Sequence, residues 1–409
     1  MAGDRIVIRN GVVFDSPAAA LVGERTVVIE GDRIVAVTDE PVGGGDGREV
    51  DAAGATVLPG LIDAHVHVAV ATMDFGRAAS MPLTLVALHA ARALEAMLRR
   101  GFTTVRDAGG ADGGMAAGVE HGLVAGPELL RAGRALSQTG GHGDTRSRSA
   151  APATCACELV ETGIAVLADG PDAVRRAARE QLRGGAHAIK VMASGGVASP
   201  SDPIWLEAYT PGELEAAVEE AARWRTYVLA HAYTPGAIRR AVEAGVRSIE
   251  HGNLLDGPTA TLMAERGVHL VPTLVTYWAI AEHGAAFGLP GFALEKVSEV
   301  LDAGRRSVEL AAAAGVDIGF GTDLLGEAGT FQSRELSLRA EIQPAAEVLR
   351  SATAVNARLL GREGELGVVE EGARADLVVV RGDPTADVSL LEDGRHLLAV
   401  VRRGELLEG

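Results

Sequence analysis

The chain is poor in aromatic residues and cysteine. Aromatic residues make up 3% of its 409 residues, although hydrophobic residues as a whole make up 47%. The cysteines are Cys155 and Cys157, which are too close in sequence to form an easy disulfide and too few to build a disulfide scaffold. This low count favours a reducing compartment. Metal binding by the C-x-C pair is a weak alternative.

Positive charge is also in deficit. The formal net charge is −17, from 38 lysines and arginines against 55 aspartates and glutamates. This balance argues against nucleic acid and anionic membranes as partners. No apolar run reaches the length of a membrane span, and the opening MAGDRIVIRNG lacks the apolar segment of a signal peptide. We therefore expect a cytoplasmic protein.

Regular alternation of strand-like and helix-like segments fills residues 58–355. Helical stretches such as TLVALHAARALEAMLRR and TPGELEAAVEEAARW alternate with short apolar segments such as FTTVRD, HAIKVMAS and TYVLAHA. Several helices begin at Pro and end at Gly, as expected of capped helices. Eight such strands can be counted, which predicts an α/β fold with a (β/α)₈ TIM-type barrel. An open doubly wound sheet is the alternative.

The two ends of the chain have a different, β-rich pattern. Near the N-terminus, Asn10-Gly11 and Gly31-Asp32 both indicate hairpin turns between strands. The segments ARADLVVVRG and LLAVVRRGELL near the C-terminus are also strand-like. We predict that residues 1–57 and 356–409 form one small discontinuous β-sandwich domain around the barrel of residues 58–355.

Potential metal ligands stand where predicted barrel strands end. His65 and His67 are two residues apart in the extended segment DAHVH, so both side chains face the same way. Three more strand ends carry His231, His251 and Asp323. Active sites of barrels lie at this face, and imidazole with carboxylate suits Zn²⁺ or a similar divalent ion. One histidine alone would indicate packing, but this set favours a metal site.

Lys190 stands in the apolar segment HAIKVMASGGV, at the inward phase of the fourth barrel strand. A buried lysine costs free energy unless it is paired or modified. Reaction with CO₂ would convert the amine into an anionic bridge between two metal ions. A salt bridge to an acid is the alternative interpretation.

Several of these segments resemble the amidohydrolase superfamily over nearly the whole chain. The motifs are PGLIDAHVH, GFTTVRDAGG, KVMASGGV, LAHAY, SIEHG, GTD and NARLLGREGELGVVEEGARADLVVV. Within it, SQTGGHGD and SGGVASPSDP look like the Xaa-Pro dipeptidase (prolidase-like) and ochratoxinase-like branch. The resemblance implies two divalent ions, Zn²⁺ by preference. His65, His67 and Asp323 would hold the buried ion, His231 and His251 the exposed one, and carboxylated Lys190 would bridge both.

The same resemblance implies a mechanism. A metal-bridging hydroxide attacks the amide carbonyl, and Asp323 takes its proton and passes it to the leaving nitrogen. We predict that His142 and Tyr233 contact the substrate and stabilise its anionic intermediate. Gly195 and Gly196 would let substrate approach the backbone, or would simply form a tight turn. Asp63 and Asp107 are candidates for holding ligand histidines, or for a turn and a helix cap.

The predicted enzyme hydrolyses amide or peptide bonds of Xaa-Pro dipeptides or N-acyl amino acids, and resembles a branch that is often homo-oligomeric. One alternative is an ochratoxin-type or cyclic-amide (imidazolone-like) hydrolase of the same superfamily. Imidazolonepropionase-like enzymes use one metal ion and lack the bridging lysine, so Lys190 argues against that member. A non-catalytic scaffold of the same fold is a further alternative, and the complete ligand set argues against it.

Overall fold

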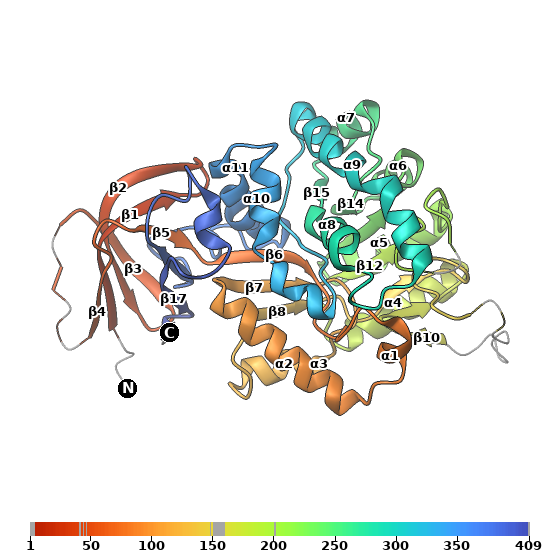
Figure 1. Cartoon of the computed structure of the whole chain (residues 1–409), viewed down its shortest axis with the longest axis horizontal. Helices are drawn as coiled ribbons and strands as arrows, with labels where there is room; N and C mark the ends of the chain where they lie inside the picture. The colour runs from red at the N-terminus through yellow and green to blue at the C-terminus, as the bar shows by residue number, and fades with distance from the viewer. Residues whose placement is uncertain are drawn as a thin grey trace.

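The protein has a β domain at one end and a larger α/β part at the other (Figure 1). A computed structural model describes residues 5–40, 42–43, 45, 47–147, 149, 160–199 and 202–407. Cys155 and Cys157 lie outside these residues, so their role stays a prediction. The first and last segments of the chain lie together in the β domain (Figure 1). Within the described residues, no helix has the length and apolarity needed to cross a membrane.

The β domain is one sheet built from both ends of the chain. Its strand order is β18-β17-β16-β5-β1-β2-β3, and β4 pairs with β1. The β2–β3 and β17–β18 turns meet, because a Cβ added at Gly404 would stand 1.7 Å from the Gly31 carbonyl oxygen. The sheet therefore curves around an apolar core. Its strands are β1 (Arg5–Asp15), β2 (Ala20–Glu30), β3 (Arg33–Thr38), β4 (Arg48–Asp51), β5 (Thr56–Pro59), β16 (Leu377–Val380), β17 (Leu397–Arg402) and β18 (Glu405–Leu407).

One of the two predicted hairpin turns is wrong. Gly31-Asp32 does join β2 and β3, whose end residues Glu30 and Arg33 pair. Asn10-Gly11, in contrast, is an irregularity inside the continuous strand β1, with Asn10 at a φ of 55°. The irregularity lets β1 pair first with β4 and then with β5. Tertiary pairing therefore overrides the local turn signal.

Eight parallel segments form the barrel. Seven are strands: β6 (Leu61–Val66), β7 (Phe102–Asp107), β8 (Glu128–Arg131), β12 (Ile189–Met192), β13 (Val228–Ala232), β14 (Ser248–His251) and β15 (His269–Val271). Residues 318–320 take the eighth position. Ile318 bridges Leu270 of β15, and the Phe320 carbonyl accepts a hydrogen bond of 2.9 Å from the Ala64 amide of β6.

Short links join the separate barrel sheets, β6-β7-β8 and the sheet that contains β12-β13-β14-β15, into a ring. On the side away from residues 318–320, the His187 amide donates to the Arg131 carbonyl at 2.8 Å. The fold is therefore a (β/α)₈ barrel with a β domain, and the open-sheet alternative is wrong. Three further strands extend the sheet beside β12: β9 (Ala135–Ser137), β10 (Val160–Thr162) and β11 (Ala165–Leu167).

Helices cover the outside of the barrel (Figure 1). Their ends follow the predicted chemistry, since Thr210 and Glu213 form a capping box at the start of α5, and Gly245 ends α6 at a φ of 98°. The helices are α1 (Phe75–Ala79), α2 (Leu83–Arg99), α3 (Gly113–Glu120), α4 (Pro171–Arg183), α5 (Pro211–Arg223), α6 (Pro235–Ala244), α7 (Gly257–Glu265), α8 (Leu274–His283), α9 (Gly291–Ala314), α10 (Arg334–Ala340), α11 (Ala345–Arg350) and α12 (Asn356–Leu359), with short turns η1 (Gly326–Phe331), η2 (Ser351–Val355) and η3 (Val388–Leu391).

Two buried ionisable residues on α10 support the segment that follows β15. Glu335 and Arg339 are both fully buried. Glu335 accepts a hydrogen bond of 2.7 Å from the Val275 amide at the start of α8, and Arg339 donates at 3.0 Å to the Gly319 carbonyl. Burial raises the pKa of Glu335 to about 8, against the opposite effect of Arg339. The Glu335 carboxyl therefore holds its proton more tightly in the folded protein than in the unfolded chain.

This raised pKa predicts how stability depends on pH. The unfolded carboxyl loses its proton near 4.5 and the folded one near 8, so its contribution to stability is full below pH 4.5 and is lost as the pH rises to about 8. Glu335→Gln should remove this loss. We expect its thermal unfolding midpoint, relative to the native chain, to be higher at pH 8.5 than at pH 5 by about 2 °C or more.

The control for this experiment is Glu341→Gln, which changes an exposed carboxylate that pairs with Arg305. Its shift in midpoint should be the same at both pH values. An equal shift for Glu335→Gln at the two pH values would contradict the raised pKa.

Candidate functional site

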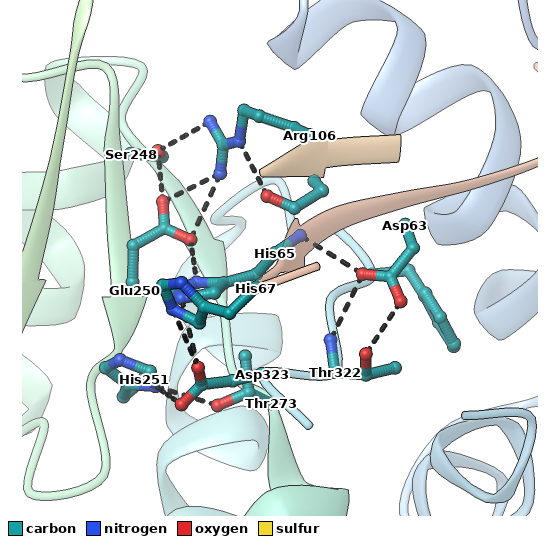
Figure 2. A network of polar contacts seen from close by, with 12 residues as sticks. Asp63, His65, His67, Arg106, Ser248, Glu250, His251, Thr273, Thr322 and Asp323 are labelled. Carbon is teal, nitrogen blue, oxygen red and sulfur yellow. Dashed lines mark hydrogen bonds and ion pairs between the residues drawn. The ribbon is translucent and has the colours of Figure 1, made fainter. Parts of the chain in front are cut away.

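Three predicted ligands form a compact cluster at the carboxyl end of the barrel. Oδ1 of Asp323 lies 3.1 Å from Nε2 of His67 and 3.4 Å from Nε2 of His65. These three residues offer ligand atoms that all lie within 4.8 Å of one another (Figure 2). Two imidazoles and a carboxylate at this spacing fit a divalent transition-metal ion.

The aromatic rings of four other predicted site residues follow one another outward from this cluster. They are His251, His231, His142 and Tyr233. Nδ1 of His251 lies 4.0 Å from Oδ2 of Asp323, and its ring centroid lies 4.7 Å from that of His231. The His142 ring stacks on His231 with centroids 4.3 Å apart, and Tyr233 lies 4.9 Å from His231. In the structure, Nε2 of His231 contacts the Gly195 carbonyl oxygen at 3.1 Å.

The protonation of the imidazoles suits metal binding. Burial lowers the pKa of His65, His231 and His251 well below the usual value, so these rings are neutral and keep a lone pair for a ligand bond. Burial also opposes charge on His67, but the adjacent Asp323 carboxylate raises the pKa of that ring. The site thus combines three neutral rings with the pair of His67 and the Asp323 carboxylate, whose own pKa, against the opposite effect of burial, is lowered by the adjacent histidines and Lys190.

Lys190 is buried in the barrel wall and has no hydrogen-bond or ion-pair partner among the described residues. It shares its strand face with Ala188, which packs on Leu229 inside the barrel. Burial lowers the pKa of Lys190 to about 8, against the charges of Glu250 and Asp323. Part of the amine is therefore neutral at neutral pH. The salt bridge considered as an alternative is not formed with any acid in the described part of the chain.

Left-handed backbone turns several side chains into the site. His251, Thr273 and Asp323 have φ angles of 74°, 48° and 52°, a region that residues other than glycine rarely adopt. Glu250 and His251 are adjacent in β14, and regular strand geometry would send them to opposite faces. The positive φ of His251 instead turns its ring toward Thr273, whose hydroxyl lies 2.8 Å from Nδ1 of His251. Such strain typically persists only where the surroundings enforce it.

Glu250 anchors His65, the first candidate ligand, from inside the barrel. Its Oε2 contacts Nδ1 of His65 at 2.6 Å, and both of its oxygens accept from the Arg106 guanidinium at 2.9 and 3.0 Å (Figure 2). Ser248 donates to the same carboxylate at 2.5 Å. Glu250 and Arg106 are almost fully buried. The carboxylate fixes the His65 ring so that Nε2 faces Asp323.

Asp63 and Asp107 accept hydrogen bonds from backbone amides and not from the histidine rings. Asp63 accepts from the His65 amide and from the amide and hydroxyl of Thr322, which ties the first strand to the loop carrying Asp323. Asp107 accepts from the backbone amides of Val68, Gly109 and Ala111. The Gly109 carbonyl in turn lies 2.7 Å from Nδ1 of His67.

Neighbouring atoms leave no room for a side chain at Gly195 or Gly196. A Cβ at Gly195 would stand 1.9 Å from the Pro203 carbonyl oxygen, and a Cβ at Gly196 would stand 2.2 Å from Cε1 of His142. Neither has a positive φ. The second glycine therefore makes room for His142, and a role in substrate contact stays a prediction.

Sequence reasoning did not identify several residues that support the site. These are Arg106, Ser248, Glu250 and Thr273 around the ligands, and Ser199, Asp202, Tyr277 and Lys296 around His142 and Tyr233. Glu250 carried one usable signal, since an acid two residues after Ser248 in a buried strand needs a cation. The Tyr277 hydroxyl donates to the Tyr233 hydroxyl at 2.9 Å, which leaves the proton of Tyr233 free to donate elsewhere.

Comparison with known proteins settles the family. The family model described as the amidohydrolase family matches residues 56–407. The chain belongs to the amidohydrolase family. This amidohydrolase is therefore a metal-dependent hydrolase of amide carbon–nitrogen bonds.

Individual relatives of this amidohydrolase place it beside two kinds of enzyme. It is 32% identical over 365 residues to ochratoxinase from Aspergillus niger, covering 86% of this chain and 76% of that protein. A crystal structure of a prolidase complexed with N-methylphosphonate-L-proline is 49% identical, covers 99% of both chains and has a TM-score of 0.95. A Xaa-Pro dipeptidase with bound methionine is 30% identical, with a TM-score of 0.88 over 99% of this chain and 100% of that one.

The contact of Glu250 with His65 predicts how strongly metal is retained. In Glu250→Gln the ring loses its charged partner, and we expect metal affinity to fall by about 10- to 100-fold. Competition with a chelator, read by elemental analysis of the protein, measures this change.

The matched control is Glu220→Gln. Glu220 is also buried and pairs with arginines, but it lies on α5 away from the site. It should retain metal like the native chain. Equal retention in Glu250→Gln would show that the His65 contact does not matter for metal binding.

Proposed function

We propose that this amidohydrolase cleaves the amide bond of Xaa-Pro dipeptides or of N-acyl amino acids. Its similarity over the whole chain to a prolidase crystallised with a phosphonate derivative of proline supports this substrate class. The proposed cofactor is a pair of divalent ions, Zn²⁺ by preference. The proposed ligands are His65, His67, Lys190 (carboxylated), His231, His251 and Asp323.

The observation that carries the binuclear site is the buried amine of Lys190. Its Nζ has no partner among the described residues, and a buried cation in that position would repel metal ions. Carboxylation removes this conflict. The neutral amine attacks CO₂ and loses a proton, which leaves an anionic carbamate with two oxygen ligands.

Side chains of the site would transfer the proton and stabilise the intermediate in the proposed mechanism. Bound divalent ions supply an activated water nucleophile and polarise the scissile carbonyl. Asp323 lies beside both histidines and can accept the proton of the attacking water and deliver it to the leaving nitrogen. Tyr233 keeps a free proton because Tyr277 donates to it, and with His142 it can donate to the anionic intermediate.

Ochratoxin hydrolysis is a second candidate activity. The similarity to ochratoxinase, with 32% identity over most of the chain, favours it. The two activities would use the same metal site, so only the substrate panel separates them.

A substrate panel tests the proposed function. The panel holds Xaa-Pro dipeptides, dipeptides without proline, N-acyl amino acids and ochratoxin A. We expect turnover of at least one of the first three classes, loss of turnover after dialysis against a chelator, and recovery on addition of Zn²⁺. Metal analysis should give two ions per chain. Hydrolysis of ochratoxin A alone would replace the dipeptide assignment. If no substrate of the panel is hydrolysed in a metal-dependent way, both candidate activities are wrong.

The state of Lys190 can be tested separately, because the chain has only one other lysine, Lys296. Protein equilibrated with ¹³C-bicarbonate should show one carbamate signal by ¹³C NMR. Lys190→Met should lose the signal together with bound metal. Lys296→Met should keep it, since the Lys296 ammonium donates to three carbonyls and is not available to CO₂. A carbamate signal that survives in Lys190→Met would place the modification elsewhere.

A further inference from the structure

Polar contacts of Gly196, Ser199 and Asp202, which we call the β12 turn, converge on the Asp202 carboxylate. Oδ2 of Asp202 accepts from the Gly196 amide at 2.7 Å and lies 3.2 Å from Nδ1 of His142. Its other oxygen, Oδ1, accepts from the Ser199 hydroxyl, which itself lies 2.7 Å from Nδ1 of His142. The Asp202 side chain is fully buried. Both carboxylate oxygens are therefore used, and together they hold one edge of the His142 ring.

These contacts decide which nitrogen of His142 faces the site. A carboxylate cannot donate, so Nδ1 carries a proton toward Asp202. Nε2 is then the ring nitrogen left for substrate, and among the described residues it has no hydrogen-bond partner. The ring plane is also fixed, because His142 stacks on His231 with an interplanar angle of 15°.

Lys296 of α9 ties this turn together from the outside. Its Nζ donates to the carbonyls of Gly196, Ser199 and Asp202 at 2.9, 2.8 and 2.5 Å. It also lies 4.0 Å from Oδ1 of Asp202. All three ammonium protons are used on residues of one turn, and the side chain is only 16% exposed.

The choice of lysine here is unusual for this chain. Of its 38 lysines and arginines only two are lysine, Lys190 and Lys296. Arginine serves at every other cationic position. An ammonium directs three donors tetrahedrally toward three carbonyls, whereas the planar guanidinium fork suits carboxylates. The turn therefore needs the lysine geometry as well as a positive charge.

We propose that Lys296 is a positioning residue for His142, acting through the β12 turn (Gly196, Ser199 and Asp202). Lys296 fixes the three carbonyls, the turn fixes Asp202, and Asp202 presents Nε2 of His142 to the substrate. The kinetic part of this inference rests on the proposed function. Lys296 itself touches neither the substrate nor the metal ligands.

Kinetics of a mutant cycle test the proposal on whichever amide substrate the enzyme turns over. Lys296→Met should lower kcat/KM by about 10- to 100-fold, chiefly through kcat, with metal content unchanged. Lys296→Arg should recover only part of this loss. Arg305→Met, which removes an exposed cation from the same helix, should keep native kinetics.

The same substitution in a His142→Asn background separates positioning from general damage. Asn keeps a donor toward Asp202 but removes Nε2, so Lys296→Met should then have little further effect. A loss of the same size in both backgrounds would overturn the proposal, as would native kinetics in Lys296→Met.

A readout without substrate keeps the test independent of the proposed function. In ¹⁵N-histidine-labelled protein with its metal bound, the His142 signals are identified by their absence in His142→Asn. Lys296→Met should change the ring nitrogen shifts of His142, and Arg305→Met should not. Unchanged His142 shifts in Lys296→Met would overturn the inference, even if the amide substrates prove correct.

Discussion

The site depends on how the barrel interior accommodates the buried carboxylate of Glu250. An ionised group in this interior is tolerated only with cations and hydrogen-bond donors around it. Arg106 from β7, His65 from β6 and Ser248 from the same strand provide them. One carboxylate thereby links three barrel strands and fixes the orientation of a candidate ligand, His65. Removing one partner of such a buried pair typically costs about 3–5 kcal/mol, so the support is structural as well as chemical.

Charge balance connects this carboxylate to Lys190. The interior already holds the Arg106 cation, and two divalent ions would add further positive charge. A cationic Lys190 would oppose them, whereas a carbamate would join Asp323 and Glu250 on the negative side. The proposed modification therefore follows from the same electrostatic requirement that places Glu250 beside Arg106.

The ends of the barrel strands were predictable because they obey local rules. Alternation in DAHVH pairs His65 with His67, and the structure places Asp323 beside both. The supporting contacts had no such signal. Glu250 meets His65, and Lys296 meets the turn at Gly196, across long stretches of sequence. The wrong turn at Asn10-Gly11 has the same origin, since pairing with β4 and β5 determines the path of β1. Local patterns predicted the candidate ligands, and only the fold could reveal what holds them.

The position of β5 has a consequence for the order in which the chain can fold. This strand, Thr56–Pro59, lies between β1 from the first residues and β16, Leu377–Val380, from the last. During synthesis its β1 edge can pair at once, but the other edge stays open until the whole barrel has been made. An open strand edge is a template for association with other chains. The newly made protein thus carries an exposed edge for most of translation, and the C-terminal strands close it last.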